Sequence, residues 1–398
     1  METPVAQIGA PARDVSPGEL FRFARNVEYQ TRTAITSSRL WEMERVLGHG
    51  SYGLTMLLRD RDPLTLRNHR RVVLKRALVP EVGVDDFVRE AAALEDLRGH
   101  SHISQLIAWT RNTRQFQRTG RGQRIRQVFR RLLGAVGRNP PEAIFRALGN
   151  IAGPAILSEY QPNGNLANIM LLQYEHNIIF PNRLLWGFYH CMVSACVGMT
   201  YRKDGPIGGP LALERLRGAR PHYRLLHNDI AGRNIMLGNI EPAVRVHRAL
   251  PKLVLIDFGL SQRVPPGNER YAETENLTAQ MLMLINPRRL ENGQAALEPV
   301  QWGGFLTLAS GILDEAQFPT LDPELRQLLA ESFRCTADYQ PERRPSLAET
   351  YLRTRRGTRK GPSEYPYQLR LFERDDSLRA LLDAILYDVN HNRDEWSY

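Results

Sequence analysis

The stretch that decides the fold of this chain is RLLHNDIAGRNIML, residues 224–237. Its polar centre holds Asp229 and Asn234, five residues apart on one tight loop, so both side chains can face the same point. In such an arrangement an aspartate can accept the proton of a hydroxyl group, and an asparagine can ligate a metal ion. The apolar residues on both sides predict that the ends of the loop are buried, which argues against an ordinary polar surface loop.

A second carboxylate follows a buried strand. Asp257 comes directly after the apolar run LVLI and before Phe258-Gly259. A carboxylate at the end of a buried strand is costly unless it meets a cation. Mg²⁺ that also contacts phosphate oxygens would be such a cation.

Upstream of both loops lies a glycine-rich run, Gly48-His49-Gly50-Ser51-Tyr52-Gly53, between two predicted strands. Glycines there let the backbone approach phosphate groups and point N–H groups at them. Taken alone, the run also fits an ordinary glycine-rich hairpin. A dinucleotide-binding fold needs a helix directly after the glycines, whereas LTMLLR continues as a strand.

Lys75 ends the apolar strand VVLK, and Glu90 lies fifteen residues later on a helix predicted over 85–97. A lysine on the buried side of a strand needs a partner to tolerate desolvation. Each residue alone would be unremarkable on a surface. In this order, after the glycine-rich run, they match a lysine–glutamate pair that holds the α- and β-phosphates of ATP.

Together these motifs resemble the eukaryotic protein kinase superfamily over about residues 41–350, and most closely its divergent fungal kinase-like proteins. Two further elements match: ILSEY at 156–160, as a hinge, and YQPERRPSLAET at 339–350, with Arg344 before Pro-Ser. The resemblance implies an α+β, protein-kinase-like bilobal fold. Its small N-terminal lobe would be mainly β with one key helix, and its larger C-terminal lobe mainly α.

The resemblance also assigns roles around ATP and Mg²⁺. Lys75 would bind the α/β-phosphates and Glu90 would orient it. Val73 would pack on the adenine, and Ser158 would be a small gatekeeper beside it. The full set of residues implied to contact ATP is Gly48, Gly50, Ser51, Tyr52, Gly53, Val73, Lys75, Ser158, Glu159 and Gln161.

In the catalytic loop, the resemblance makes Asp229 the catalytic base. Arg233, four residues later, would reach the γ-phosphate. Asn234 and Asp257 would hold Mg²⁺.

The departures from the family pattern bear on regulation and on the acceptor. Asn228 stands where the family has an arginine that pairs with an activation-loop phosphate, and Ala231 stands where a lysine is common. No Ala-Pro-Glu follows Asp257, and only the short segment 261–277 precedes the next helical run. We therefore expect weakened peptide docking, and an Arg344 that lacks its usual glutamate partner.

Three functions remain open at this level. The first is a protein kinase acting on Ser or Thr of a protein substrate. The second is a small-molecule phosphotransferase of the choline- or aminoglycoside-kinase type, whose catalytic loops also read His-Asn-Asp with an asparagine five residues on. The third is a nucleotide-binding pseudokinase scaffold. Against it stands the presence of all five key residues, which are Lys75, Glu90, Asp229, Asn234 and Asp257.

The order of predicted elements divides the chain into four parts. Residues 1–40 are expected to be an extension with a short helix at 19–29. Residues 41–161 form the N-lobe, with a basic insertion at about 110–150, and 162–356 form the C-lobe. Residues 357–398 form a C-terminal extension with a predicted helix, and everything from about Leu277 is expected to be helical.

The net charge of +10 is concentrated in residues 111–138, which contain nine arginines and no acidic residue. Apolar residues at helical spacing from Ile125 to Val136 predict an amphipathic helix with arginines on its other face. Such a helix fits an acidic partner or an anionic membrane surface. It also fits an insertion that packs on the small lobe, and no nucleic-acid recognition motif accompanies it.

The remaining composition points to a cytoplasmic or nuclear protein. The N-terminus has no secretory pattern, and no apolar stretch is long enough for a transmembrane helix. Three cysteines, Cys191, Cys196 and Cys335, do not form a disulfide framework. We expect Cys191 and Cys196 to be core residues, because no His/Cys spacing in the sequence suggests a zinc site.

Overall fold

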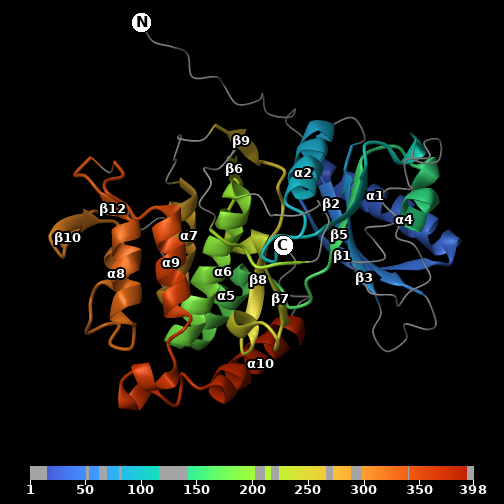
Figure 1. The fold of residues 1–398 in the computed structure, drawn as a ribbon. Helices are drawn as coiled ribbons and strands as arrows, with labels where there is room; N and C mark the ends of the chain where they lie inside the picture. The colour runs from blue at the N-terminus through green and yellow to red at the C-terminus, as the bar shows by residue number, and fades with distance from the viewer. Residues whose placement is uncertain are drawn as a thin grey trace, which may run out of the picture. The chain divides into compact units, whose positions relative to one another are not determined.

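A computed structural model of the chain shows an α+β protein (Figure 1). It describes residues 16–50, 53–61, 70–79, 83–115, 142–201, 211–216, 224–265, 272–287, 298–338 and 340–391. These residues form two compact units. Unit 1 comprises the described residues of 1–91 and 106–160, and unit 2 comprises those of 92–105 and 161–397.

Unit 1 is built on a five-stranded antiparallel sheet with the order β1-β2-β3-β5-β4. The strands are β1 (Trp41–His49), β2 (Gly53–Asp60), β3 (Arg71–Ala77), β4 (Leu106–Thr110) and β5 (Ala155–Glu159). In β3, Val72 and Leu74 are fully buried and the residues between them are more exposed, as a sheet with one face on the core requires. The strands expected from Trp41 to Trp109 are thus present.

The N-terminal helix α1 (Pro17–Ser38) is longer than the short helix expected at 19–29. It begins with a capping box between Ser16 and Glu19. Its buried residues, among them Ile35, join the core of unit 1 together with Trp41. The helix therefore packs into the core of unit 1.

Two more helices complete unit 1. The helix α2 (Val84–Asp96) begins in this unit, and α4 (Glu142–Ala147) packs on α1 through the core that contains Ile144 and Phe145. The predicted amphipathic helix at 125–136 lies outside the described residues.

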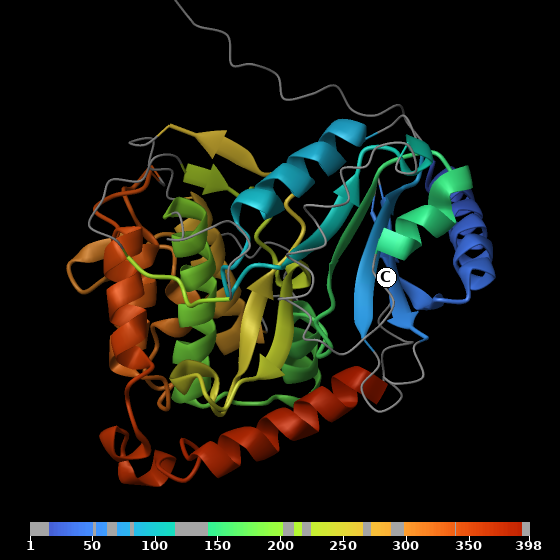
Figure 2. The ribbon, with the colours of Figure 1, turned by 45° about the vertical axis from the view of Figure 1, so that its right-hand side comes forward.

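Unit 2 is mainly helical. Its helices are α5 (Leu166–His176), α6 (Asn182–Thr200), α7 (Ala272–Ile285), α8 (Pro323–Ser332), α9 (Leu347–Gly357) and α10 (Asp375–His391). Because α6 is apolar on all sides, it must be covered on all sides. It packs against α7, α9 and β8 (Pro251–Leu255), and Figure 2 shows β8 in yellow beside α6 in green.

Unit 2 also contains short strands. β6 (Arg224–Leu226) pairs with β9 (Gln262–Val264), and β7 (Ile235–Ile240) pairs with β8. A three-stranded sheet follows, made of β10 (Val300–Trp302), β11 (Phe305–Thr307) and β12 (Arg334–Cys335). This sheet contradicts the expectation of helix throughout from Leu277. Gly303 and Gly304, both with positive φ, make the tight turn between β10 and β11.

The segment before α10 is tied to the start of α6. The carboxylate of Glu373, 1% exposed, accepts hydrogen bonds from the backbone N–H groups of Asn182 and Arg183 at 2.8 and 2.9 Å. Residue Pro181, at the N-cap of α6, offers no side-chain cap. Glu373 therefore satisfies donors that α6 cannot satisfy locally. Within the described part of the chain, no helix has both the length and the apolar character needed to cross a membrane.

Candidate functional site

The glycine-rich turn joins β1 to β2 in unit 1. Its hydrogen bond from Gly50 N to Gly53 O measures 2.9 Å. A Cβ atom on Gly53 would lie 3.2 Å from the carbonyl oxygen of Arg76 and 3.3 Å from Phe87, so a side chain there would crowd both neighbours. A Cβ on Gly48 or Gly50 would meet nothing within 4 Å. Packing among the described residues therefore gives no reason for these two glycines. Ser51 and Tyr52 lie outside the described residues.

Lys75 and Glu90 form an ion pair in unit 1. Lys75 Nζ lies 2.8 Å from Glu90 Oε2. The two side chains are 22% and 7% exposed, so the pair is largely shielded from water. Lys75 reaches it from β3 and Glu90 from α2, and this contact is the one that their order in the sequence suggested.

The remaining residues predicted to contact ATP lie on β3, β5 and the following chain. Val73 on β3 is directly opposite Ser158 on β5, and both are half-buried. Glu159 is also half-buried, at the end of β5. Gln161 belongs to unit 2 and is buried.

In unit 2, the loop after β6 brings Asp229, Arg233 and Asn234 together. The amide nitrogen of Asn234 donates to Oδ2 and to the backbone oxygen of Asp229, at 2.8 and 2.9 Å. Arg233 Nη2 lies 2.5 Å from Asp229 Oδ1. The short helix η4 (Gly232–Asn234) provides this geometry by turning the chain back toward Asp229. Arg233, expected to reach a phosphate, here pairs with Asp229, and its side chain is 63% exposed.

His227, to which the sequence assigned no role, connects this loop to the strand before Asp257. Its Nδ1 accepts the backbone N–H of Asp229 at 3.2 Å, and its Nε2 donates to the carbonyl of Ile256 at 2.9 Å. These two bonds require the neutral tautomer with hydrogen on Nε2. Burial lowers the pKa of His227, which favours that neutral form. The ring also packs edge-on against Phe258, with centroids 4.7 Å apart.

Two residues of these loops have a left-handed backbone. Asn228 has φ of 64° and Asp257 has φ of 62°. Non-glycine residues pay for this conformation, and such residues cluster at functional sites. Asparagine tolerates it better than most, and Asn228 also donates from its side chain to the carbonyl of Leu260 at 2.9 Å. The local backbone thus gives a physical reason for asparagine at position 228.

Arg344 has a glutamate partner, contrary to the expectation from the missing Ala-Pro-Glu. Its Nη1 lies 2.7 Å from Glu275 Oε2, and its Nε donates to the carbonyl of Arg334 at 2.8 Å. The Arg344 side chain is 2% exposed. Glu275 stands in the first turn of α7, so a residue of that helix takes the place that the sequence pattern left empty.

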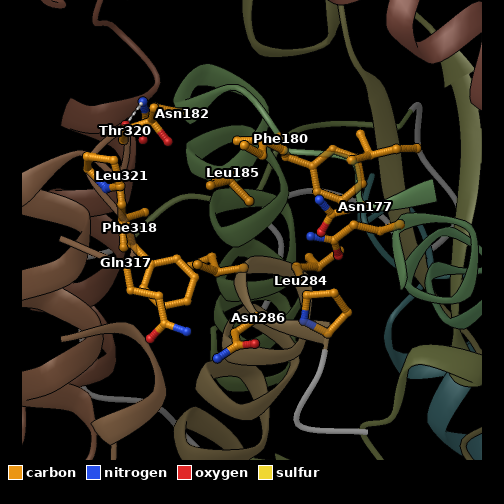
Figure 3. Close-up of a pocket in the computed structure, with 16 residues that line it drawn as sticks. Asn177, Phe180, Asn182, Leu185, Leu284, Asn286, Gln317, Phe318, Thr320 and Leu321 are labelled. Atoms are coloured by element: carbon orange, nitrogen blue, oxygen red, sulfur yellow. Dashed lines mark hydrogen bonds between the residues drawn. The ribbon is translucent and has the colours of Figure 1, made fainter. Parts of the chain in front are cut away.

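A separate pocket of about 300 Å³ lies in unit 2 (Figure 3). It is lined both by apolar side chains such as Phe180 and Leu185 and by amide side chains such as Asn177 and Gln317. It contains none of the predicted site residues, so it is not the place where the sequence motifs converge.

No protein-family model matches this chain, and no curated protein shows a significant similarity to it.

Proposed function

We propose that this chain is an ATP- and Mg²⁺-dependent phosphotransferase with a protein-kinase-like bilobal fold, and that it transfers the γ-phosphate of ATP to a serine or threonine hydroxyl of a protein. The observation that carries the proposal is the loop in which Asn234 holds Asp229 and His227 ties that loop to the strand before Asp257. Such a network fixes a potential base relative to a potential metal ligand, and positioning of this kind supplies much of the catalysis in phosphoryl transfer.

The two proposed metal ligands, Asn234 after β6 and Asp257 after β8, fit Mg²⁺. The side-chain oxygens of Asn234 and Asp257 are hard donors of the type that Mg²⁺ prefers, and Asn234 is 6% exposed. Asn234 uses its amide nitrogen toward Asp229, so its amide oxygen points elsewhere and suits a cation. The bound ion would neutralise charge on the phosphate oxygens.

The remaining roles follow from the contacts of each side chain. Lys75, fixed by Glu90, would bind phosphate oxygens of ATP. Asp229 would accept the proton of the acceptor hydroxyl as its oxygen bonds to the γ-phosphorus and the bond to the ADP oxygen breaks. Arg233 already contacts Asp229, and a rotation of its exposed side chain would free it to contact the transferred phosphate.

A protein acceptor is favoured over a small molecule by the contact between Arg344 and Glu275. This ion pair, buried on its arginine side, fixes the start of α7, directly after the segment that would receive a peptide. A fixed α7 would give a peptide one stable edge to dock against. The small-molecule and scaffold functions remain as outcomes of the test.

The test is transfer of label from γ-labelled ATP with Mg²⁺, with a general protein substrate and a panel of small alcohols and amines. Asp229→Asn should retain ATP binding but lose turnover by orders of magnitude, and Asp257→Asn should also lose turnover. Asp376→Asn, at an exposed site on α10, is the matched control and should leave the rate unchanged.

Label on protein that disappears in both site variants supports the proposal. Label only on a small molecule would replace it with the small-molecule phosphotransferase. ATP binding without any transfer would replace it with the scaffold, and full activity of Asp229→Asn would refute the assignment of the base.

A further inference from the structure

Three potential metal ligands, none of which was assigned to ATP or Mg²⁺ above, meet in the interior of unit 2. They are His102 from the loop before β4, Cys191 from the middle of α6, and His247 from the short helix η5 (Arg245–His247) between β7 and β8. All three are at most 1% exposed. One potential ligand atom from each residue can be chosen so that all three lie within 4.8 Å of one another.

The measured separations match those around a tetrahedral zinc ion. His102 Nε2 lies 3.1 Å from His247 Nε2, and Cys191 Sγ lies 3.5 Å from the same nitrogen. Zinc bonds of about 2.0–2.1 Å to nitrogen and about 2.3 Å to sulfur, at tetrahedral angles, place two nitrogens about 3.3 Å apart and a nitrogen and a sulfur about 3.6 Å apart. These two separations therefore fit a His₂Cys ligand set, and all three ligand atoms lie within 4.8 Å of one another.

Hydrogen bonding alone does not account well for this arrangement. Both His102 Nε2 and Cys191 Sγ approach His247 Nε2. A neutral imidazole nitrogen offers either one lone pair or one N–H, which serves one neighbour well. An ion placed among the three atoms would contact all of them at once.

An outer carboxylate orients the His102 imidazole in the way that zinc-bound histidines require, and a second carboxylate lies near His247 without a hydrogen bond to it. His102 Nδ1 lies 2.5 Å from Glu214 Oε2, and Glu214 Oε1 also accepts the backbone N–H of His102 at 2.9 Å. A proton held between Nδ1 and a carboxylate leaves the Nε2 lone pair for a metal, as in carboxylate–histidine–zinc arrangements. His247 turns its Nδ1 toward Glu241, with 3.8 Å between Nδ1 and Oε2.

The charges also balance. A Zn²⁺ ion, the thiolate of Cys191 and the fully buried carboxylate of Glu214 sum to zero, which lowers the cost of burying them together. Sulfur and imidazole ligands with tetrahedral spacing favour zinc among the common divalent metals. The geometry points to a zinc site formed by His102, Cys191 and His247, with Glu214 as the carboxylate that orients His102.

The site would join three segments that are distant in the sequence: the loop before β4, the central helix α6 and the connection from β7 to β8. Each contributes a single ligand, so the ion would act as a cross-link inside unit 2. Metal binding of this kind contributes directly to folding stability.

The first experiment measures metal in the full chain, purified without a histidine tag and dialysed against zinc and then against metal-free buffer. We expect stoichiometric zinc by elemental analysis. Replacement by Co²⁺ should give the near-ultraviolet thiolate-to-cobalt absorption and the visible bands of a tetrahedral site. The band from sulfur should disappear in Cys191→Ser. It should persist in Cys196→Ser, the matched control, because Cys196 lies on the same helix and is also 1% exposed.

A measurement on the wild type covers the case in which Cys191→Ser fails to fold. A strong chelator should lower the melting temperature of the wild-type chain, and added zinc should restore it. Absence of zinc and of a cobalt spectrum in folded wild-type protein would overturn the proposal in favour of a metal-free hydrogen-bonded cluster. Undiminished metal binding in a folded Cys191→Ser variant would overturn the ligand assignment. None of these readouts uses phosphotransfer, so the zinc site and the proposed activity can fail independently.

Discussion

Removal of the Arg344–Glu275 ion pair should destabilise unit 2 strongly. Arg344 makes two charge-assisted hydrogen bonds, to Glu275 Oε2 at 2.7 Å and to the carbonyl of Arg334 at 2.8 Å, while its side chain is 2% exposed. Hydrogen bonds to charged groups contribute about 1.5–3 kcal/mol each, so Arg344→Leu should cost about 3–5 kcal/mol of unfolding free energy. Glu275 is 36% exposed, and Glu275→Gln keeps an acceptor, so we expect a loss of about 1–2 kcal/mol.

A double-mutant cycle separates the pair from the other contacts of each residue. Urea titrations followed by circular dichroism of the wild type, both single variants and the double variant give the coupling energy, which we expect to be about 1–2 kcal/mol. The same cycle on Arg374 and Asp376, whose side chains are 57% and 65% exposed, is the control, and its coupling energy should be clearly smaller because water screens an exposed pair. A coupling energy for Arg344 and Glu275 no larger than that of the control pair would refute the reasoning.

Three further predictions concern single residues of the candidate site. Glu90→Gln removes the charged partner of Lys75 and should lower the rate of ATP-dependent transfer about 10- to 100-fold in initial-rate assays; an unchanged rate would contradict the role of the pair. Burial lowers the pKa of His227 from 6.5, so the unfolded chain binds its proton more readily, and the stability present above pH 6.5 is lost as the pH falls. Urea titrations should show that the free energy of unfolding of the wild type falls between pH 7.5 and pH 5.5, and that it falls less in His227→Gln. Because Asn228 has φ of 64°, Asn228→Ala should be about 1–2 kcal/mol less stable than Asn228→Gly in thermal melts; equal stability would contradict this.

The elements predicted well from the sequence have long or β-branched apolar runs. The β-branched run of β3 and the long apolar run of α6 each fit one structure, a strand packed on the core and a helix that is covered on all sides. The sheet of β10, β11 and β12 was missed because strands of two or three residues are too short to show a period. Its one usable signal was Gly303-Gly304 between Trp302 and Phe305, a turn sequence flanked by aromatic residues.

Among the contacts of the unit 2 sites, too, some could be predicted from the sequence and others could not. Asp229 and Asn234 are five residues apart, so their contact follows from a single loop. His247 lies 56 residues from Cys191 and 145 from His102, and no local spacing reveals that these three side chains meet. Glu275 could not be predicted for a different reason. The family pattern places the glutamate partner of Arg344 in an Ala-Pro-Glu triplet, whereas the fold supplies a carboxylate from the first turn of α7.

The capping of α6 by Glu373 has a consequence for synthesis on the ribosome. Glu373 is 191 residues beyond Asn182, so the central helix of unit 2 leaves the ribosome long before the carboxylate that satisfies its first turn. Until that carboxylate arrives, the exposed N–H groups of the first turn depend on water. The first turn of α6 therefore stays incomplete until a segment 191 residues further along the chain has been made, and a ribosome stalled before Glu373 would hold a chain whose central helix frays at its start.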